Sequence, residues 1–448
     1  MKGNRLFGVY LLVIISMTLA ACGGAATTPV ATSAPVKTEV AAVDESACNI
    51  TPPESATTVN VLGWPFPIMD YYTDQMKACS EVQNIDVNVQ KIDFTAVDDS
   101  IRLALSTGGV SPYDIVHGSN PEMIEFGSKG WLLPLNDLID KYRTQYKLDD
   151  IFPAGWDAAT IDGKIYGVPV NMNTLQLFYN ADIFKKYNLD VPKTYDDIIT
   201  ACNVLKADKD LDIPFAIDVS AGWAWEITFF STIRSFGGDY LNADNTPAIN
   251  SPQGVAAATK LKEVVDACME GKATSYGYEA FEGALCNGTI AFVQDWANFG
   301  STAADPNTCA NAASIKFAPG AAPNPGGSLD GSAWFDFFYI PKNTKVDPDL
   351  IFRVIMEAAK PEKMQEAAKL GFITRQSIPQ QMPNGDSAML TLQKGAGPYP
   401  VNPALPLVQA ALGNWLPLIG DGSNTPQDGL NAAAAEYTAV ATKQGYIK

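Results

Sequence analysis

The chain has 448 residues, of which 47% are apolar, and 49 acidic against 31 basic residues give it a formal charge of −18. This length is too great for one compact core and favours two domains. The negative charge argues against a nucleic-acid partner, because phosphate backbones would repel the chain. Such acidity is typical of an exported soluble protein, and it also leaves a cationic ligand open.

The first 22 residues resemble the leader of a bacterial lipoprotein. Lys2 and Arg5 form a short positive segment, and a mostly apolar run covers residues 6–19. A run this short is an export signal and not a membrane span, which needs about 20 residues. The Leu-Ala-Ala-Cys sequence ending at Cys22 is similar to a lipobox, whose cysteine is acylated after cleavage. We therefore expect residues 1–21 to be a signal peptide and Cys22 to carry the lipid. An ordinary signal peptide with a chance cysteine is the alternative.

Residues 22–57 are rich in Thr, Ala, Pro and Ser and have no hydrophobic period, so we expect a flexible tether there. The elements that follow are predicted from hydrophobic periodicity. They are a strand at 58–62, a helix at 70–82, a strand at 86–92, a helix at 97–105 and a buried strand at 113–116 that ends at His117-Gly118. Asn120 and Pro121 are then typical of an N-cap and a first helical residue.

The second half of the chain continues to alternate strands and helices. A capping box at 194–197 opens a helix whose buried stripe includes Cys202. Ser251 and Pro252 open another, which reaches Cys268 and stops at Gly271. A third starts at Asp347-Pro348 and breaks at Pro361, and Gly371 ends the next. This alternation predicts α/β layers with mostly parallel sheets.

Six cysteines remain besides Cys22, and an even number in an exported chain favours disulfides over metal ligands. His117 is the only histidine and no CxxC pair exists, so we expect no metal site. Six cysteines allow 15 pairings. From the placement of the elements, we expect Cys48–Cys79, Cys202–Cys268 and Cys286–Cys309.

No common catalytic motif is present. The chain has no GxSxG elbow and no GxxxxGK phosphate loop, and a single histidine rules out HExxH. We therefore expect no enzyme activity, no catalytic residue and no cofactor. A secreted glycoside hydrolase stays an alternative, because 49 acidic residues always offer pairs of carboxylates.

Tryptophan at predicted loop ends is the main functional signal. An indole covers the apolar face of a sugar ring, while nearby polar side chains bind its hydroxyl rim. Trp131 and Trp156 fit packing positions better. The better-placed tryptophans are Trp64, Trp223, Trp296 and Trp334, and acidic residues near the tryptophans are Glu226, Asp295 and Asp336.

Three stretches together resemble a known family. They are Tyr-Gly-Val-Pro at 166–169, Leu-Phe-Tyr-Asn-Ala-Asp-Ile-Phe at 177–184 and Val-Pro-Lys-Thr-Tyr at 191–195. Further support comes from Gly-Trp-Leu-Leu-Pro-Leu at 130–135 and Gly-Thr-Ile-Ala-Phe at 288–292. The chain is similar to the extracellular solute-binding proteins of carbohydrate ABC transporters, the group that includes maltose-binding protein. The resemblance covers roughly residues 58–448.

The resemblance implies a type II periplasmic-binding-protein fold, with two α/β lobes joined by a hinge and a ligand cleft between them. Lobe one would comprise residues 58–170 and 339–375, and lobe two residues 171–338 and 376–448. The chain would cross between lobes at 166–173, at 333–339 and near 374–376. The implied ligand-binding residues are Trp64, Asn120, Asn173, Trp223, Trp225, Glu226, Asp295, Trp296, Trp334 and Asp336.

The implied function is capture of a sugar or oligosaccharide outside the membrane and delivery to the permease subunits of an ABC transporter. We expect a monomer that is lipid-anchored to the outer face of the cell membrane through Cys22. A polyol, a polyamine or a peptide is an alternative ligand, and the acidic residues beside the tryptophans would suit a polyamine. A purely structural surface lipoprotein is a further alternative.

Overall fold

The computed structural model describes residues 48–448. The predicted signal peptide, the predicted lipid attachment at Cys22 and residues 22–47 of the predicted tether lie outside the described residues. Between residues 48 and 448, no helix is long and apolar enough to cross a bilayer.

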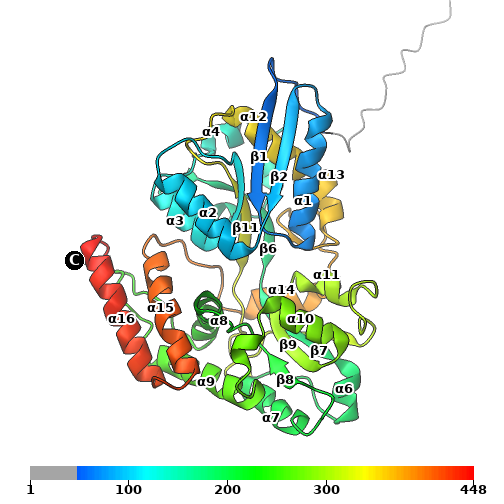
Figure 1. Cartoon of the computed structure of the whole chain (residues 1–448), viewed down its shortest axis with the longest axis vertical. Helices are drawn as coiled ribbons and strands as arrows, with labels where there is room; N and C mark the ends of the chain where they lie inside the picture. The colour runs from blue at the N-terminus through cyan, green and yellow to red at the C-terminus, as the bar shows by residue number, and fades with distance from the viewer. Residues whose placement is uncertain (1–47) are drawn as a thin grey trace, which may run out of the picture. The chain divides into compact units, whose positions relative to one another are not determined.

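The first main sheet has six strands in the order β12-β6-β11-β3-β1-β2, and we call the elements that pack on it the first lobe (Figure 1). Its edge strand β2 alternates buried Ile85 and Val87 with exposed Asp86 and Asn88, which is the pattern of a half-buried strand. The elements of the first lobe are β1 (Thr57–Gly63), α1 (Pro67–Lys77), η1 (Ala78–Glu81), β2 (Ile85–Lys91), α2 (Phe94–Ser106), β3 (Ile115–Ser119), α3 (Asn120–Ser128), α4 (Asn136–Tyr142), η2 (Leu148–Asp150), α5 (Pro153–Ala158), β4 (Thr160–Ile161), β5 (Lys164–Ile165), β6 (Gly167–Asn173), β11 (Trp334–Tyr339), α12 (Pro348–Ala358), α13 (Pro361–Ala367) and β12 (Phe372–Ile373).

The second main sheet has four strands in the order β10-β7-β9-β8, and the elements that pack on it form the second lobe. In Figure 1 this sheet and its helices lie at the other end of β6 and β11 from β1 and β2. The elements of the second lobe are β7 (Leu175–Asn180), α6 (Ala181–Lys186), α7 (Tyr195–Leu205), β8 (Ile213–Ala216), α8 (Gly222–Ser235), α9 (Pro252–Cys268), η3 (Ala273–Ser275), α10 (Tyr278–Asn287), β9 (Ile290–Trp296), α11 (Phe299–Ala304), β10 (Ile315–Pro319), α14 (Gly385–Lys394), α15 (Leu405–Gly420) and α16 (Pro426–Lys443).

Both sheets are mixed, so the prediction of mostly parallel sheets was wrong. In the first sheet β1 is parallel to β2 and β3, but β11 is antiparallel to β3 and β6. In the second sheet β8 and β9 are parallel, while β7 is antiparallel to both of its neighbours. Two consecutive strands can pair in parallel only if a long crossover connection returns the chain to the end of the sheet where the first strand began. Here β6 runs through Thr174 directly into β7 of the other sheet, and β11 arrives from the second lobe.

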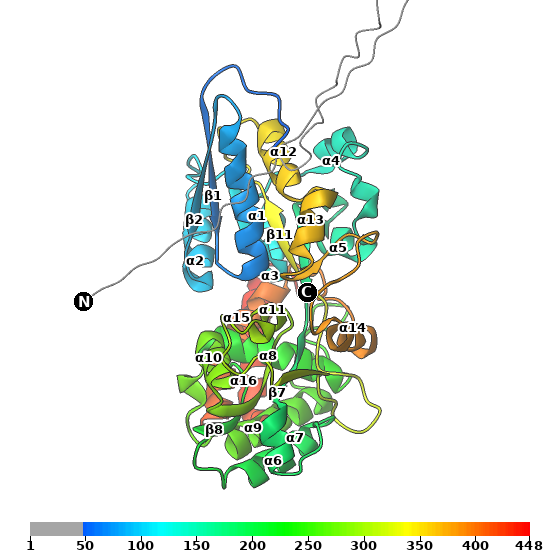
Figure 2. The ribbon, with the colours of Figure 1, turned by 90° about the vertical axis from the view of Figure 1, so that its right-hand side faces the viewer.

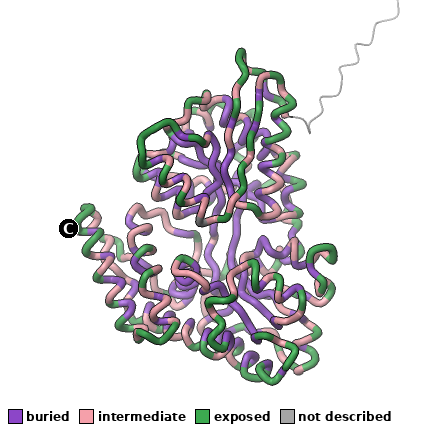
Figure 3. The backbone as a smooth tube through the Cα atoms, in the orientation of Figure 1, coloured by how far each residue is buried: buried purple, intermediate pink, exposed green. Residues whose placement is uncertain are grey.

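Helices cover both faces of each sheet. On the first lobe α1 packs with α12 and α13, and Figure 2 shows these three together; α2 and α3 contact β1 and β3. On the second lobe α7 and α9 contact β8, and α15 packs against α8 and α16. The central strands are buried and the outer helix faces are exposed (Figure 3). One core cluster, which includes Val59, Ile68 and Phe338, fills one face of the first sheet, and a second runs from Val116 to Phe292 of the second lobe.

Several helices begin where their caps were predicted. Thr194 and Asp197 form a capping box, in which Thr194 Oγ1 accepts from the Asp197 amide (3.1 Å) and the Asp197 carboxylate accepts from the Thr194 amide (2.9 Å). Ser251 caps α9 and Asp347 caps α12 through side-chain oxygens. The predicted helix at 70–82 is instead α1 from Pro67, followed by the 3₁₀ turn η1.

The third strand continues further than predicted. It runs from Ile115 to Ser119, and His117 and Gly118, which were expected to end it, pair with Phe338 and Phe337 of β11. The antiparallel partner is more than 200 residues away, so no local pattern marks the extension. A helix follows directly, as predicted.

The N-cap of α3 is Ser119 and not the predicted Asn120. Its amide and hydroxyl both donate to Oε2 of Glu122, at 2.8 and 2.6 Å. Asn120 and Pro121 are therefore the first two residues of the helix, one position later than expected.

The chain passes between the lobes three times. The first passage is at Thr174, between β6 and β7, and the second lies between β10 and β11. Residues 171–173 and 334–338, which the resemblance assigned to lobe two, thus belong to strands of the first sheet. Their pairing partners in β6 and β11 are too far apart in sequence for the motifs to reveal them.

The third passage comes later than the predicted 374–376. Thr374 Oγ1 donates to the Pro169 carbonyl (2.8 Å). The buried guanidinium of Arg375 donates to three carbonyl oxygens of the first lobe, all at 2.9 Å, those of Tyr146, Lys147 and Ala359. These bonds hold both residues on the first lobe. Leu370 and Phe372 already share hydrogen bonds with Ser301 and Asn298. Beyond Arg375, the chain bonds to the second lobe at Asn384, whose Nδ2 donates to the Ala297 carbonyl (2.7 Å).

Three disulfides join Cys48 to Cys79, Cys202 to Cys268 and Cys286 to Cys309, which are the expected pairs. The first of them holds the beginning of the described chain on the first lobe. The Asn49 amide also donates to Oε2 of Glu357 (3.0 Å), and Ile50 is buried. Residues 48–50 are therefore held on the first lobe, and the tether prediction, which extended to residue 57, was too long.

Candidate functional site

Seven aromatic side chains follow one another from the first lobe to the second and on to β11, and we call them the aromatic row. They are Trp64, Phe94, Trp223, Tyr278, Trp296, Trp334 and Tyr399. Successive ring centroids lie 5.0, 5.4 and 6.4 Å apart from Trp64 to Tyr278, and 5.5 and 5.0 Å apart from Trp296 to Tyr399. Between the two halves, the side chain of Trp296 lies near the Tyr278 hydroxyl. The row crosses between lobes at Phe94 of α2 and Trp223 of α8.

The first-lobe end of the row is built on the carboxyl end of β1. Trp64 stacks on His117, with centroids 3.5 Å apart. Burial lowers the pKa of His117, and its Nε2 lies 3.1 Å from Oδ1 of Asp336. Oδ2 of Asp336 accepts from Nδ2 of Asn171 (2.7 Å). Both oxygens of Asp336 therefore have protein partners, and this residue positions His117 beneath Trp64.

Helix α8 supplies the next part of the site. Trp223 is 36% exposed and lies one turn before Glu226, so the two share a helix face. Oε2 of Glu226 accepts from Nε2 of Gln409 on α15 (3.2 Å), while Oε1 has no hydrogen-bond partner among the described residues. Trp225 is buried against α15, where a methyl group on Gly420 would lie 2.2 Å from its ring. Of the three predicted residues here, Trp225 thus fills a packing position.

The end of β9 and the start of α10 bring acidic and aromatic groups together. Asp295 is fully buried; its Oδ1 accepts from the Trp296 amide (2.6 Å), and its Oδ2 receives no hydrogen bond from a described donor. Burial, together with the nearby Glu282 carboxyl, raises the pKa of Asp295 well above its usual range. Burial raises the pKa of Glu282 to about 7.

The beginning of β11 completes the row. Trp334 is 8% exposed, between Trp296 and Tyr399, and the Tyr399 hydroxyl has no partner among the described residues. Next to it, Oδ1 of Asn120 accepts from the Phe335 amide (2.6 Å), which leaves its buried Nδ2 unpartnered. Asn173 is used differently, because its Oδ1 accepts from the amides of Thr174 and Asn298 and so fixes the first passage between lobes.

At this site a carboxyl group of the first lobe acts on a carboxyl group of the second lobe. Glu122 of α3 and Glu226 of α8 are both buried, and burial is the main reason that the pKa of each rises to about 7. The charge of Glu122 raises the pKa of Glu226 further, and both charges act on the Tyr399 hydroxyl. Helix α3 also contacts α15 of the second lobe. The three residues thus converge from α3, α8 and the segment before α15.

Buried polar atoms without a partner are rare, because leaving one unpaired costs about 1–3 kcal/mol. Among the described residues, those on or beside the aromatic row include Nδ1 of His117, Nδ2 of Asn120, Oε1 of Glu226, Oδ2 of Asp295 and the Tyr399 hydroxyl. A set of this kind next to aromatic faces suits a ligand that has both hydroxyl groups and an apolar face.

The structure brings most of the predicted site residues together. Trp64, Asn120, Trp223, Glu226, Asp295, Trp296 and Trp334 lie on or beside the aromatic row, whereas Asn173, Trp225 and Asp336 have protein partners that occupy them. The residues that the sequence did not single out are Phe94, Glu122, Tyr278, Glu282 and Tyr399. Of these, only Glu122 carries a local signal, the Ser119-x-x-Glu122 capping box.

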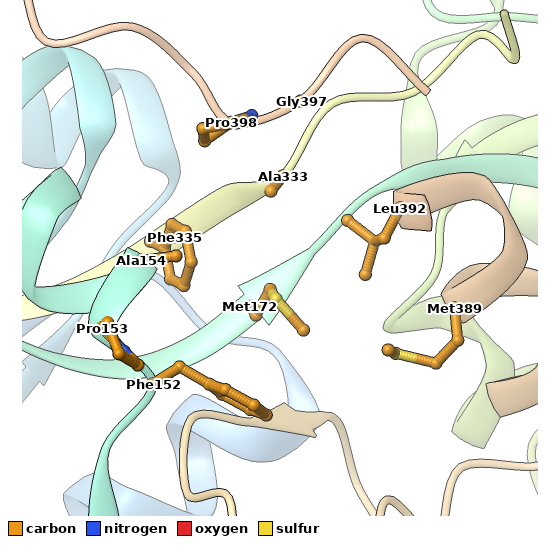
Figure 4. A pocket seen from close by; sticks show the side chains of 10 residues that line it. All are labelled: Phe152, Pro153, Ala154, Met172, Ala333, Phe335, Met389, Leu392, Gly397 and Pro398. Atoms are coloured by element: carbon orange, nitrogen blue, oxygen red, sulfur yellow. The ribbon is translucent and has the colours of Figure 1, made fainter. Parts of the chain in front are cut away.

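A separate cavity of about 260 Å³ lies beside the strands that join the lobes (Figure 4). Ala333, just before β11, and Phe335 on β11 face this cavity. Met172 faces it from β6, and Met389 and Leu392 face it from α14. Trp334 lies between Ala333 and Phe335 and so points to the opposite side of the strand. The named side chains carry no hydroxyl, amide or charge that could bind a polar ligand. We therefore assign the functional site to the aromatic row and not to this cavity.

The chemistry available at the row is recognition. No group of three or more His, Cys, Asp or Glu side chains in residues 48–448 is arranged to hold a metal ion. The row offers indole and phenol faces, carboxyl groups and amides, which are groups that bind polar ligands.

Comparison with known proteins identifies the family. The model of the family described as bacterial extracellular solute-binding proteins matches residues 69–359, which is more than half of the chain. This chain belongs to that family. It is thus a binding protein and not an enzyme.

Individual relatives agree with this assignment. An uncharacterised ABC transporter extracellular-binding protein of Pyrococcus horikoshii is 28% identical over 233 residues, 51% of this chain and 50% of the relative. The erythritol/L-threitol-binding protein of Mycolicibacterium smegmatis is 24% identical over 297 residues, 62% of each chain. The chain thus spans about half the length of the first curated relatives that it matches.

The fold is that of a type II periplasmic binding protein. The solved structure of an ABC transporter solute-binding protein from Agrobacterium radiobacter, in complex with ribitol, superposes with a TM-score of 0.77 at 18% identity. The superposition covers 87% of this chain and all of the other.

Proposed function

We propose that this chain is the solute-binding lipoprotein of an ABC importer and that it captures a sugar or sugar alcohol. The observation that carries the proposal is the aromatic row with unpartnered buried polar atoms beside it. Membership of the solute-binding family supports it. The named ligands of the two relatives, erythritol or threitol in one and ribitol in the other, favour a polyhydroxy compound.

In this proposal the ligand lies along the aromatic row. The indoles of Trp296 and Trp334 cover its C–H face, while Glu226 and Asp295 accept hydrogen bonds from its hydroxyl groups. Asn120 donates through the Nδ2 that the protein leaves unpartnered. The binding residues are thus Trp64, Asn120, Trp223, Glu226, Asp295, Trp296 and Trp334, with Tyr278 and Tyr399 added.

We further propose that ligand binding favours the arrangement in which the two lobes meet. The two lobes are those implied by the family resemblance, with boundaries moved to Thr174, to the segment before β11 and to the segment before Asn384. A ligand that contacts both lobes binds this arrangement better than a separated one, so it shifts the population toward it. The closed complex then docks on the permease, and the chain stays near the membrane through lipid on Cys22. Mass analysis of the mature N-terminus tests for that lipid.

The central test is ligand binding by the purified chain and two tryptophan variants. Thermal-shift and calorimetric titrations with tetritols, pentitols, hexitols, hexoses and maltose should identify at least one ligand that raises the melting temperature. A ligand at 100 times its dissociation constant stabilises the native state by about 2.7 kcal/mol. Trp296→Ala should weaken its binding by about 30-fold, since truncation of a central aromatic contact costs about 2 kcal/mol.

Trp131→Ala is the matched control. Trp131 is also half-buried but packs against Phe126 and Lys129 at the far end of α3, so this variant should bind as the wild type does. Equal losses in both variants would contradict the assigned site, and no stabilisation by any polyhydroxy compound would contradict the proposed function.

A further inference from the structure

The second-lobe part of the site contains a group of acidic and aromatic residues that we call the acidic–aromatic cluster. Its members are Asp218 after β8, Tyr278 and Glu282 on α10, and Asp295 and Trp296 at the end of β9. Tyr278 and Glu282 are four residues apart on one helix, so they share a face. The cluster thus combines three carboxyl groups with two aromatic rings.

Contacts hold the cluster together. Oδ1 of Asp218 accepts from the amide and hydroxyl of Ser220 at 3.0 and 2.7 Å, and the Tyr278 amide lies near the same carboxylate. The side chain of Trp296 lies near the Tyr278 hydroxyl. Helix α10, which carries Glu282, packs on β9, which carries Asp295, and the nearby Glu282 carboxyl raises the pKa of Asp295. Oδ2 of Asp295, on a fully buried side chain, receives no hydrogen bond from a described donor.

The described residues supply no compensating positive charge to Asp218 or Glu282. Burial raises the pKa of Asp218, Glu282 and Asp295, and Asp218 and Glu282 add to the shift of Asp295. Among the described residues, no Lys, Arg or His contributes to the shifts of Asp218 or Glu282. Two neighbouring carboxyl groups cannot both ionise in a buried site unless a cation joins them. A proton satisfies that need in the free protein, and a positively charged ligand would satisfy it in the complex.

We propose that the ligand is a polyhydroxy compound that carries a protonated amino group, such as an amino sugar or amino alditol, and that Asp295 and Glu282 bind this group. The proposal rests on the function proposed above. An ammonium donates charge-assisted hydrogen bonds to both carboxylates, and it is attracted to the ring faces of Trp296 and Tyr278. A neutral hydroxyl can make only the weaker hydrogen bond. The carboxyl pair and the rings therefore favour the same ligand chemistry.

The test compares ligands that differ only in the amino group. Calorimetry at pH 7 measures D-glucose against D-glucosamine, and D-sorbitol against 1-amino-1-deoxy-D-sorbitol. N-acetyl-D-glucosamine is the control in which the amine is blocked. In at least one pair, the amine should bind at least about ten-fold more tightly than its neutral partner, while the acetylated compound should lose the advantage.

Three variants locate the preference. Asp295→Asn is nearly isosteric and should bring the ratio of amine to neutral affinity close to one. Glu282→Gln, at a half-buried position, should do the same if the fold does not tolerate the first change. Asp212→Asn is the control, because Asp212 is an exposed second-lobe carboxylate that bonds only Tyr276 among side chains, and it should keep the wild-type ratio.

Equal or tighter binding of the neutral partners would overturn this inference and leave the proposed function intact. An amine preference that survives both Asp295→Asn and Glu282→Gln would also overturn it. Failure of every compound, neutral or charged, would contradict the proposed function and this inference with it.

Discussion

The buried carboxyl groups of Glu122 and Glu226 lower the stability of the folded chain when they ionise, but they are available to bind a ligand. Both are buried, and they come from helices of different lobes. Among the described residues, neither bonds a Lys or Arg side chain. Burial raises the pKa of Glu226 to about 7 from an ordinary value of 4.5, and the charge of Glu122 contributes. A carboxyl group with a pKa this high is costly to ionise in the folded chain. In its protonated form it can both donate a hydrogen bond to a ligand hydroxyl and accept one from it.

This shift predicts how stability depends on pH. Because the pKa of Glu226 is raised on folding, the folded chain binds more protons than the unfolded chain between pH 4.5 and about 7. Its contribution to stability is therefore present below pH 4.5 and is lost as pH rises toward 7. Glu226→Gln cannot ionise, so from pH 4.5 to pH 8 it should gain up to about 3 kcal/mol of unfolding free energy relative to wild type.

Urea unfolding at the two pH values measures this difference. Glu54→Gln, an exposed change in the segment before β1, is the control and should run parallel to wild type. If Glu226→Gln also ran parallel to wild type, Glu226 would be ionised without penalty in the folded chain.

Sequence neighbours revealed only part of the site. Glu226 and Asp295 were recognisable because each adjoins a tryptophan, and the structure places both beside the aromatic row. The same reasoning selected Trp225 and Asp336. In the structure Trp225 packs against Gly420, and the Asp336 carboxylate bonds His117 and Asn171. Tyr399 and Glu282 were missed because only tertiary contacts bring them to the row, and no nearby pattern reports such contacts.

Helix boundaries were more predictable than strand partners, because a cap acts over three or four residues. Thr194, Ser251 and Asp347 all cap the expected helices through their own side chains. Strand β3 ran past its predicted end because its partner β11 lies far along the chain. The pairing of Cys202 with Cys268 was predictable from local helix patterns, because each cysteine lies on the buried stripe of its helix. The structure shows that these two helices pack together.

The disulfide between α7 and α9 should carry a large share of second-lobe stability. Its cysteines are 66 residues apart, so the closed loop restricts the unfolded chain by about 4 kcal/mol. Replacement of Cys202 and Cys268 by alanine should lower the unfolding free energy by about that amount. The pair Cys286 and Cys309, 23 residues apart, provides a matched comparison with an expected loss of about 3 kcal/mol.

Guanidinium denaturation of the two double variants measures the order of these losses. A greater loss at Cys286 and Cys309 would mean that native packing, and not loop length, decides what each disulfide contributes.

At the scale of the whole molecule, the motifs predicted two lobes but not how the strands divide between them. The family stretches at 166–184 cover β6 and β7, which lie in different sheets and are separated by Thr174 alone. Because β-strand sequence carries no record of which sheet it joins, residues 334–338 were assigned to the wrong side. Direct side-chain contacts also join the two lobes, and the contact between Phe94 and Trp223 is one of them.

That contact predicts a variant that changes affinity without changing the fold. Phe94 of α2 and Trp223 of α8 touch only while the lobes meet, with centroids 5.4 Å apart, and such a pair contributes about 0.5–1.5 kcal/mol. If ligand selects the closed arrangement, loss of the contact lowers the population that binds and weakens apparent affinity by the same free energy. Phe94→Ala should therefore weaken ligand binding by about 3- to 10-fold.

Leu103→Ala is the matched control. Leu103 lies on the same helix as Phe94, is 67% exposed and is not a member of the aromatic row. Calorimetric affinities and ligand-free melting temperatures of both variants separate the two readings of the contact. Weaker binding at an unchanged melting temperature places the contact in the closed arrangement alone, because a lobe that unfolds independently does not gain from it. A fall in ligand-free melting temperature with no change in affinity would instead make the lobes one permanently joined body, in which ligand has no closure left to select.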